Sequence, residues 1–279
     1  MSTPKKKAEV VQKHVALFDV HVPHNSKLDG ILSYIKERKP THLILGGDFL
    51  NLEWASHHNE KEFALIGLEK LSSMLNKELQ AGREVLSRIN AVLPENCNKI
   101  YLPGNHEDWL YWACMRYPQL AGGLSLGVER MTFKSDLADI RKHVLASLLK
   151  SLLKTDELGF RVLPYSKELN LGKLTYVHGH QCGSGVSSMQ RLYPARNVIC
   201  GHFHTEQVLT THNSGDTRRA NQYVMVPALC NLCPGYLRSS STRWLQGFWS
   251  CDVLSNGLFA GHVVKVLDGR VIEGGRVYE

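Results

Sequence analysis

The sequence predicts a single-domain α/β fold in which two packed β-sheets carry helices on their outer faces. Up to residue 204, strand-like apolar runs alternate with helical patterns. From residue 207 the chain instead shows short runs separated by Gly, Asn and Asp, as antiparallel strands do. The last polar motif of the chain lies where this second pattern begins. A domain boundary at that point would therefore cut through the set of motifs. One domain over residues 1–279 accounts for this arrangement better than two.

The length and composition of the chain limit the possible folds and the cellular compartment that we expect. The chain has 279 residues, 43% of them apolar, which is ample for a core, and no apolar run approaches the ~18 residues of a membrane span. Residues 1–12 are expected to form a flexible basic N-terminus, and residues 120–160 a helical insertion. No apolar stretch follows the three lysines near the N-terminus, so no secretory signal is expected. The seven cysteines are odd in number and scattered, as in a cytoplasmic protein with reduced thiols.

The elements of the first part follow from apolar spacing and from breakers. Strands are expected at residues 15–18, 42–45, 99–102, 173–177 and 197–200. Helices are expected at residues 28–39, 61–92, 109–115 and 131–154. Pro40 and Pro94 end the first two helices, and Gly82 is a candidate break within the second, which reads as one long helix or two.

The second part reads as antiparallel strands. They are expected at residues 207–211, 222–227, 247–254 and 258–267. Turns are expected at residues 213–216 and 267–269, where Gly follows Ser or Asp.

A polar motif follows each of the five strands of the first part. The motifs are Asp19-Val20-His21, Gly46-Gly47-Asp48, Gly104-Asn105-His106-Glu107, His178-Gly179-His180 and Gly201-His202-Phe203-His204. Strands that present such residues at their C-terminal ends place the side chains along one rim of a sheet. Residues two apart, as in the first and last motifs, point the same way from an extended chain. A rim of carboxylate, amide and imidazole groups predicts a metal site.

The number of ligand candidates predicts two ions rather than one. Seven side chains qualify: Asp19, His21, Asp48, Asn105, His178, His202 and His204. One ion rarely needs more than three or four protein ligands, whereas two ions about 3.5–4 Å apart, bridged by a carboxylate, use them all. Such a pair polarises a phosphoryl oxygen and turns a bound water into hydroxide near neutral pH. Nitrogen and oxygen ligands without thiolate favour Mn²⁺, with Fe, Zn or Ni as alternatives.

In their order along the chain, the five motifs resemble those of the calcineurin-like metallophosphoesterases, from residue 19 to residue 204. The resemblance implies a four-layer αββα sandwich with the metals at its rim. It implies one metal held by Asp19, His21 and His204, and a second held by Asn105, His178 and His202, with Asp48 bridging. His106 would contact the phosphate and protonate the leaving oxygen or stabilise the transition state. The family often has a second Asp three residues after the bridging one, where this chain has Asn51; its role is open.

Several residues near the motifs have alternative interpretations. A lone histidine is more often structural than a ligand, and His180 is either a substrate contact or a hydrogen-bonding partner. Glu107 and Asp108 either orient neighbouring groups or cap the helix that follows. Cys230 and Cys233 have zinc-knuckle spacing, but no second Cys/His pair accompanies them, so a separate structural zinc is not expected.

Charge and aromatic residues favour a nucleic-acid substrate. The net charge is +7, and residues 1–10 and 181–243 supply most of it. A local basic field favours phosphate-bearing partners, although a basic surface without a partner is an equal alternative. Trp109 could stack on a base or form a wall of the cleft. The candidate substrate-binding residues are His180, Trp109, Arg218 and Arg219.

The expected function is a dinuclear-metal phosphodiesterase or nuclease that acts on nucleic acid through a metal-bound hydroxide. The first alternative is a phosphomonoesterase acting on phosphoprotein or nucleotide. The second is a non-catalytic, metal-containing nucleic-acid-binding protein. No membrane partner is expected, and the sequence does not indicate an oligomeric state.

Overall fold

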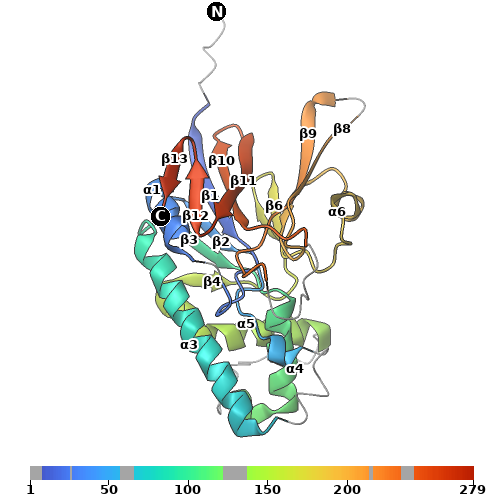
Figure 1. Ribbon diagram of the computed structural model, residues 1–279. Helices are drawn as coiled ribbons and strands as arrows, with labels where there is room; N and C mark the ends of the chain where they lie inside the picture. Colours follow the sequence, from blue (N-terminus) through green and yellow to red (C-terminus); the bar gives the residue numbers. More distant parts are fainter. Residues whose placement is uncertain (1–7, 26, 57–65, 122–136, 214–215, 234–241) are drawn as a thin grey trace, which may run out of the picture.

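The computed structural model describes residues 8–25, 27–56, 66–121, 137–213, 216–233 and 242–279, and arranges them as two mixed β-sheets with helices outside (Figure 1). The larger sheet has the strand order β13-β12-β11-β10-β1-β2-β3-β4, and the smaller one β5-β6-β7-β9-β8. The predicted fold class, two packed sheets flanked by helices, is confirmed.

The larger sheet combines a parallel half from the start of the chain with an antiparallel half from its end. The parallel strands are β1 (Val10–Leu17), β2 (His42–Leu45), β3 (Asn98–Tyr101) and β4 (Phe160–Val162). The antiparallel strands are β10 (Gly247–Leu254), β11 (Phe259–Leu267), β12 (Arg270–Glu273) and β13 (Arg276–Tyr278). β10 joins the halves by pairing antiparallel with β1.

The smaller sheet has a parallel centre and antiparallel edges. Its strands are β5 (Leu169–Leu171), β6 (Leu174–Val177), β7 (Asn197–Cys200), β8 (Gln207–Asn213) and β9 (Asp216–Met225). β6, β7 and β9 run parallel, so their C-terminal ends lie at one edge. The expected antiparallel strands of the C-terminal part therefore divide between the sheets, β8 and β9 in one and β10 and β11 in the other.

The helices form the outer layers. They are α1 (Asp29–Arg38), α3 (Leu68–Val92), α4 (Asn105–Arg116), α5 (Leu137–Leu153) and α6 (Val186–Leu192), with 3₁₀ turns η1 (Glu53–Ala55), η3 (Pro118–Ala121) and η4 (Thr155–Leu158). One apolar cluster joins α1, α3, α4 and α5 to the larger sheet, and another joins α6 to the smaller sheet.

Neighbouring side chains of the central strands point to opposite faces of their sheet, and so contribute to different apolar layers. In β2, Leu43 and Leu45 pack against the helices, whereas Ile44 packs between the sheets. In β7, Ile199 lies between the sheets while Val198 faces α6. Because side chains alternate across a strand and both faces are covered, the last three residues of each of these strands are apolar. The result is the four-layer αββα arrangement.

Of the expected helices, the one around Gly82 is a single helix, and the one after the Asn105 motif begins earlier than expected. α3 continues through Gly82, because a Cβ there would lie 3.0 Å from the side chains of Leu50 and Leu153, so the missing side chain gives room for close packing. α4 begins at Asn105 rather than at Trp109, within one of the five polar motifs, because Glu107 caps its first turn.

The expectations for residues 1–12 and 120–160 fall partly outside the described residues. Residues 1–7 and 122–136 are among those not described, and β1 begins at Val10. In the described part of residues 120–160, the end of η3, α5 and η4 lie between β3 and β4, and Phe160 begins β4. In the described ranges, no helix is long and apolar enough to cross a lipid bilayer.

Candidate metal centre

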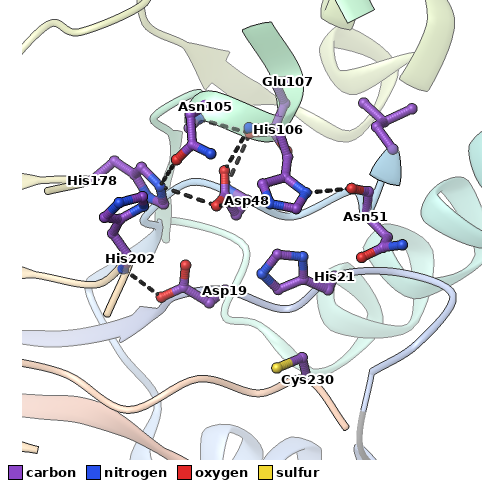
Figure 2. A network of polar contacts seen from close by, with 12 residues as sticks. Asp19, His21, Asp48, Asn51, Asn105, His106, Glu107, His178, His202 and Cys230 are labelled. Atoms are coloured by element: carbon purple, nitrogen blue, oxygen red, sulfur yellow. Dashed lines mark hydrogen bonds and ion pairs between the residues drawn. The ribbon is translucent and has the colours of Figure 1, made fainter. Parts of the chain in front are cut away.

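The five polar motifs meet at one rim, where parallel strands of both sheets end (Figure 2). β1, β2 and β3 lead to the motifs of Asp19, Asp48 and Asn105, and β6 and β7 lead to those of His178 and His202. Parallel strands in register bring their C-terminal ends together, so residues far apart in sequence become neighbours.

Asp19, His21 and His204 form one side of the centre. His21 Nε2 lies 3.3 Å from His204 Nε2, and His204 Nε2 lies 3.6 Å from Asp19 Oδ1. Asp19 Oδ1 is buried without a hydrogen-bond partner among the described residues, and its other oxygen accepts the His202 backbone N–H at 2.7 Å. An oxygen with no hydrogen bond that lies beside imidazole nitrogens fits a cation.

Asp48, His178, His202 and Asn105 form the other side. His178 Nε2 lies 3.2 Å from Asp48 Oδ2 and 2.9 Å from Asn105 Oδ1. The second ring nitrogen of His178, Nδ1, lies 3.0 Å from the Gly46 carbonyl, which fixes the ring with Nε2 toward the centre. Asp48, His178 and His202 present ligand atoms that all lie within 4.8 Å of one another.

His106 lies between the two sides, and Asp48 belongs to both. His21, Asp48 and His106 also present ligand atoms within 4.8 Å of one another, so Asp48 is shared by two ligand groups. His106 Nε2 lies 3.7 Å from Asp48 Oδ2, and its Nδ1 donates to the backbone carbonyl of Asn51 (Figure 2). Asn51, whose role the sequence left open, therefore contacts His106 through its main chain.

Five of the seven candidate ligands have a left-handed backbone. Their φ angles lie between 49° and 71°, and they are Asp19, His21, Asp48, His202 and His204. Such a conformation costs a non-glycine residue about 1–3 kcal/mol and is concentrated at functional sites. The chain therefore turns sharply after β1, β2 and β7, which directs these side chains toward a common point.

Gly104 provides the space that Asp48 occupies. A Cβ at Gly104 would overlap the Asp48 carboxylate, although the φ of Gly104, −96°, suits any residue. The requirement for glycine here is therefore steric rather than conformational.

Glu107 connects the loops that carry the ligands. Its fully buried carboxylate accepts the backbone N–H groups of Gly104, Asp48 and Leu50 at 2.7, 3.0 and 3.0 Å, and the Tyr101 hydroxyl at 2.9 Å. Burial, and then the nearby Asp48 charge, raise the pKa of Glu107. Glu107 therefore has both of the expected roles: it caps α4 and it orients the Asp48 loop.

The carboxylates control the charge of two imidazoles in the metal-free centre. Burial opposes protonation of His178, but the Asp48 carboxylate outweighs it and raises the pKa to about 9. Burial is likewise outweighed at His204, where Asp19 raises the pKa to about 10. Burial and the neighbouring His106 lower the pKa of His21 to about 3. A divalent ion held by this centre would replace the protons on His178 and His204.

Two indole rings flank the rim. The Trp109 ring lies 4.0 Å from the His106 ring between centroids, and the Trp244 ring lies 4.3 Å from that of His204. Both tryptophans are half-buried. Trp109 was expected near the site; Trp244 belongs to no motif, and no signal in the sequence identified it.

His180 belongs to a polar and aromatic wall beside the centre. Its ring stacks on Tyr165 at 5.1 Å, and its Nε2 lies 3.1 Å from the Ser166 hydroxyl. Arg141 from α5 continues the wall, 5.3 Å from the Tyr165 ring, and forms two hydrogen bonds to Asp108. Asp108 therefore fixes the position of Arg141. Nothing about the position of Asp108 in the sequence indicated this ion pair.

Arg218 and Arg219 are not brought to the rim. They lie near the start of β9, which reaches the level of Cys200 only at Met225. At about 3.3 Å per strand residue, their backbones lie roughly 20 Å from the rim. Their side chains are outside the described part of the structure.

Cys230 and Cys233 do not form a common site. The Cys230 thiol is buried and points to His204, whereas Cys233 is exposed. Neither the CxxC spacing nor any other signal in the sequence indicated the contact between Cys230 and His204.

The comparisons with known proteins assign no family to the chain. No protein-family model and no curated protein match it. A solved structure of a dimetal phosphatase from Danio rerio is similar, with 11% sequence identity over 88% of this chain and 96% of that one, and a TM-score of 0.40. This likeness is too distant to transfer an activity, so the candidate function depends on the rim of carboxylates, Asn105 and histidines itself.

Proposed function

We propose that the protein is a dinuclear-metal phosphoester hydrolase. The observation that carries the proposal is the sharing of Asp48 between two groups of potential ligands, one with His178 and His202 and one with His21 and His106. A shared carboxylate between two sets of nitrogen ligands is the arrangement that a pair of divalent ions requires. Asp19, His21 and His204 would hold one ion, and Asn105, His178 and His202 the other.

Two divalent ions, Mn²⁺ in the first instance, would supply charge to polarise a phosphoryl oxygen and would activate water. The protein residues have separate tasks. Asp48 holds both sides of the centre in register, and Asn105 adds a neutral oxygen, which leaves the site positive toward an anionic substrate. The hydrogen bond from His106 Nδ1 to Asn51 directs His106 Nε2 into the centre. From there, Nε2 can give a proton to the leaving oxygen.

The test is hydrolysis of bis-p-nitrophenyl phosphate with Mn²⁺ by wild type, Asp48→Ala and His178→Ala. Both variants should lose more activity than the 10–100-fold typical of an outer metal partner. Asp268→Ala, in an exposed turn, is the matched control and should keep full activity. Undiminished turnover in Asp48→Ala and His178→Ala would overturn the proposal.

For the substrate we propose a phosphodiester of nucleic acid. The indoles of Trp109 and Trp244 lie beside His106 and His204, and suit stacking with bases. Stacking contributes about 1–3 kcal/mol per base, so Trp109→Ala or Trp244→Ala should raise KM for an oligonucleotide roughly 5–150-fold. Trp112→Ala is the control, since Trp112 is 53% exposed and contacts Arg141 instead.

A phosphomonoesterase is the second candidate, favoured by the positions of the arginines. Arg196 is paired with Glu168 at 2.7 Å, and Arg218 and Arg219 lie far from the rim. The salt dependence of substrate binding distinguishes the nucleic-acid phosphodiesterase from the phosphomonoesterase. Binding through several phosphates should weaken roughly 10³-fold or more between about 50 and 200 mM salt, whereas binding of p-nitrophenyl phosphate should change far less.

The same assays test for a non-catalytic protein. DNA binding with Mn²⁺, without hydrolysis of oligonucleotides or of bis-p-nitrophenyl phosphate, would identify a nucleic-acid-binding protein with a metal centre.

A further inference from the structure

Cys230 lies directly behind the metal centre, on a segment fixed to the first metal-binding loop. The Leu229 N–H donates to the Asp19 carbonyl at 3.0 Å, and the Asn231 N–H donates to the His24 carbonyl at 2.7 Å. The Gln246 side chain donates to the Cys230 carbonyl at 2.8 Å. Figure 2 shows the thiol on the far side of His21 and Asp19 from His106. The backbone therefore holds this thiol at a fixed place relative to the ligands.

The two nitrogens of the His204 ring face different partners. Nε2 faces the centre, 3.3 Å from His21 Nε2 and 3.6 Å from Asp19 Oδ1. Nδ1 faces the Cys230 sulfur at 3.8 Å, within hydrogen-bonding range for sulfur. Both side chains are buried, with 8% of His204 and 5% of Cys230 exposed. The sulfur thus occupies the place where a metal-bound histidine normally has its outer hydrogen-bond partner.

We infer that Cys230 is a positioning residue for His204. The Nδ1–H donates to the Cys230 sulfur, which leaves the lone pair of Nε2 free for the metal and fixes the orientation of the ring. Outer partners of this kind contribute 10–100-fold to metal affinity. The inference rests on the proposed metal centre, and it adds a residue that none of the five motifs contains.

Metal affinity tests the inference without any assay of hydrolysis. Mn²⁺ binding to the metal-free protein is measured by calorimetry for wild type, Cys230→Ala, Cys230→Val and Cys230→Ser. The Ala and Val variants should weaken one of two sites by about 10-fold or more, and leave the other unchanged. Ser, whose hydroxyl can accept from Nδ1, should restore most of the affinity. Val fills the volume of the thiol, so a loss in both apolar variants is due to the hydrogen bond rather than to a cavity.

Cys233→Ala is the matched control, because it removes a thiol three residues away that is exposed. Wild-type affinity at both sites in the Ala and Val variants would overturn the inference. So would a thiolate-to-cobalt charge-transfer band in the Co²⁺-loaded wild type that Cys230→Ser lacks, because the sulfur would then be a direct ligand. If the wild type bound no Mn²⁺, both this inference and the proposed function would fail. If the Cys230 variants bound Mn²⁺ like the wild type, only this inference would fail and the proposed function would stand.

Discussion

At the residue scale, the centre is defined by which ring nitrogen each histidine directs inward. His178 uses Nδ1 for the Gly46 carbonyl, His106 uses Nδ1 for the Asn51 carbonyl, and His204 directs Nδ1 to Cys230. In all three, Nε2 is left facing the centre. Because a metal ligand must be unprotonated at the nitrogen that binds, these outer contacts prepare the rings of His178 and His204 for metal, whereas at His106 the contact orients the proposed proton donor.

Metal binding should release protons. The pKa values of His178 and His204, about 9 and about 10, lie above the usual range of histidine, so both rings are protonated in the metal-free protein near pH 7. Calorimetric titration with Mn²⁺ at that pH, in buffers of different ionisation enthalpy, should show roughly two protons released per chain. Binding heats that do not depend on the buffer would contradict this prediction. Above the two pKa values, the release should disappear.

His106→Asn should separate metal binding from chemistry. The variant should retain both metals and lose about 10²–10⁴-fold in kcat, the usual contribution of a general acid. The loss should be greater for an alkyl leaving group than for p-nitrophenolate, which departs without a proton. His262→Asn, on the surface beside Glu273, is the control. An equal loss for both leaving groups would exclude the role as an acid.

At the element scale, the strand ends set the positions of the ligands and the connecting loops set their precision. α4 starts within its own motif, and the Glu107 carboxylate joins that helix start to the loop after β2. The sequence identified the strands and the motifs, because periodicity and breakers are local signals. It placed the start of α4 too late, because the cap that starts the helix is part of the metal-binding motif.

Gly104→Ala should disturb Asp48 without changing any ligand. The added methyl group would overlap the Asp48 carboxylate, so the carboxylate must move away from both ligand groups. We expect loss of Mn²⁺ affinity together with a lower melting temperature, measured by calorimetry and circular dichroism. Gly67→Ala, at the start of α3 with nothing within 4 Å of the added atom, is the control. Unchanged metal affinity in Gly104→Ala would contradict the assigned position of Asp48.

At the scale of the whole molecule, the metals would join the two sheets. Asp19 and Asp48 follow strands of the larger sheet, whereas His178, His202 and His204 follow strands of the smaller one. Ions shared by these residues would add to the hydrogen bonds that already join the layers at the rim, from the His202 backbone N–H to Asp19 and between His178 and the Gly46 carbonyl.

Chelation should therefore lower stability. With free metal at about 100 times Kd, each site adds about 2.7 kcal/mol to the free energy of unfolding, so EDTA should lower Tm by on the order of 10 °C. Asp48→Ala should unfold at the same temperature with and without EDTA, which a thermal scan checks. A wild type insensitive to EDTA would show that no metal stabilises the fold.

The sequence by itself determined the fold class, the seven candidate ligands and His106, because strand periodicity, breakers and short motifs are properties of neighbouring residues. The resemblance also implied a bridging Asp48, and the structure places Asp48 in two ligand groups. Only the tertiary structure decided that Cys230 and Trp244 contact His204, and that Arg218 and Arg219 lie far from the rim. His21 and His204 are 183 residues apart, and their contact depends on how the two sheets pack. No local pattern specifies that packing, since it follows from the apolar surfaces of the whole chain.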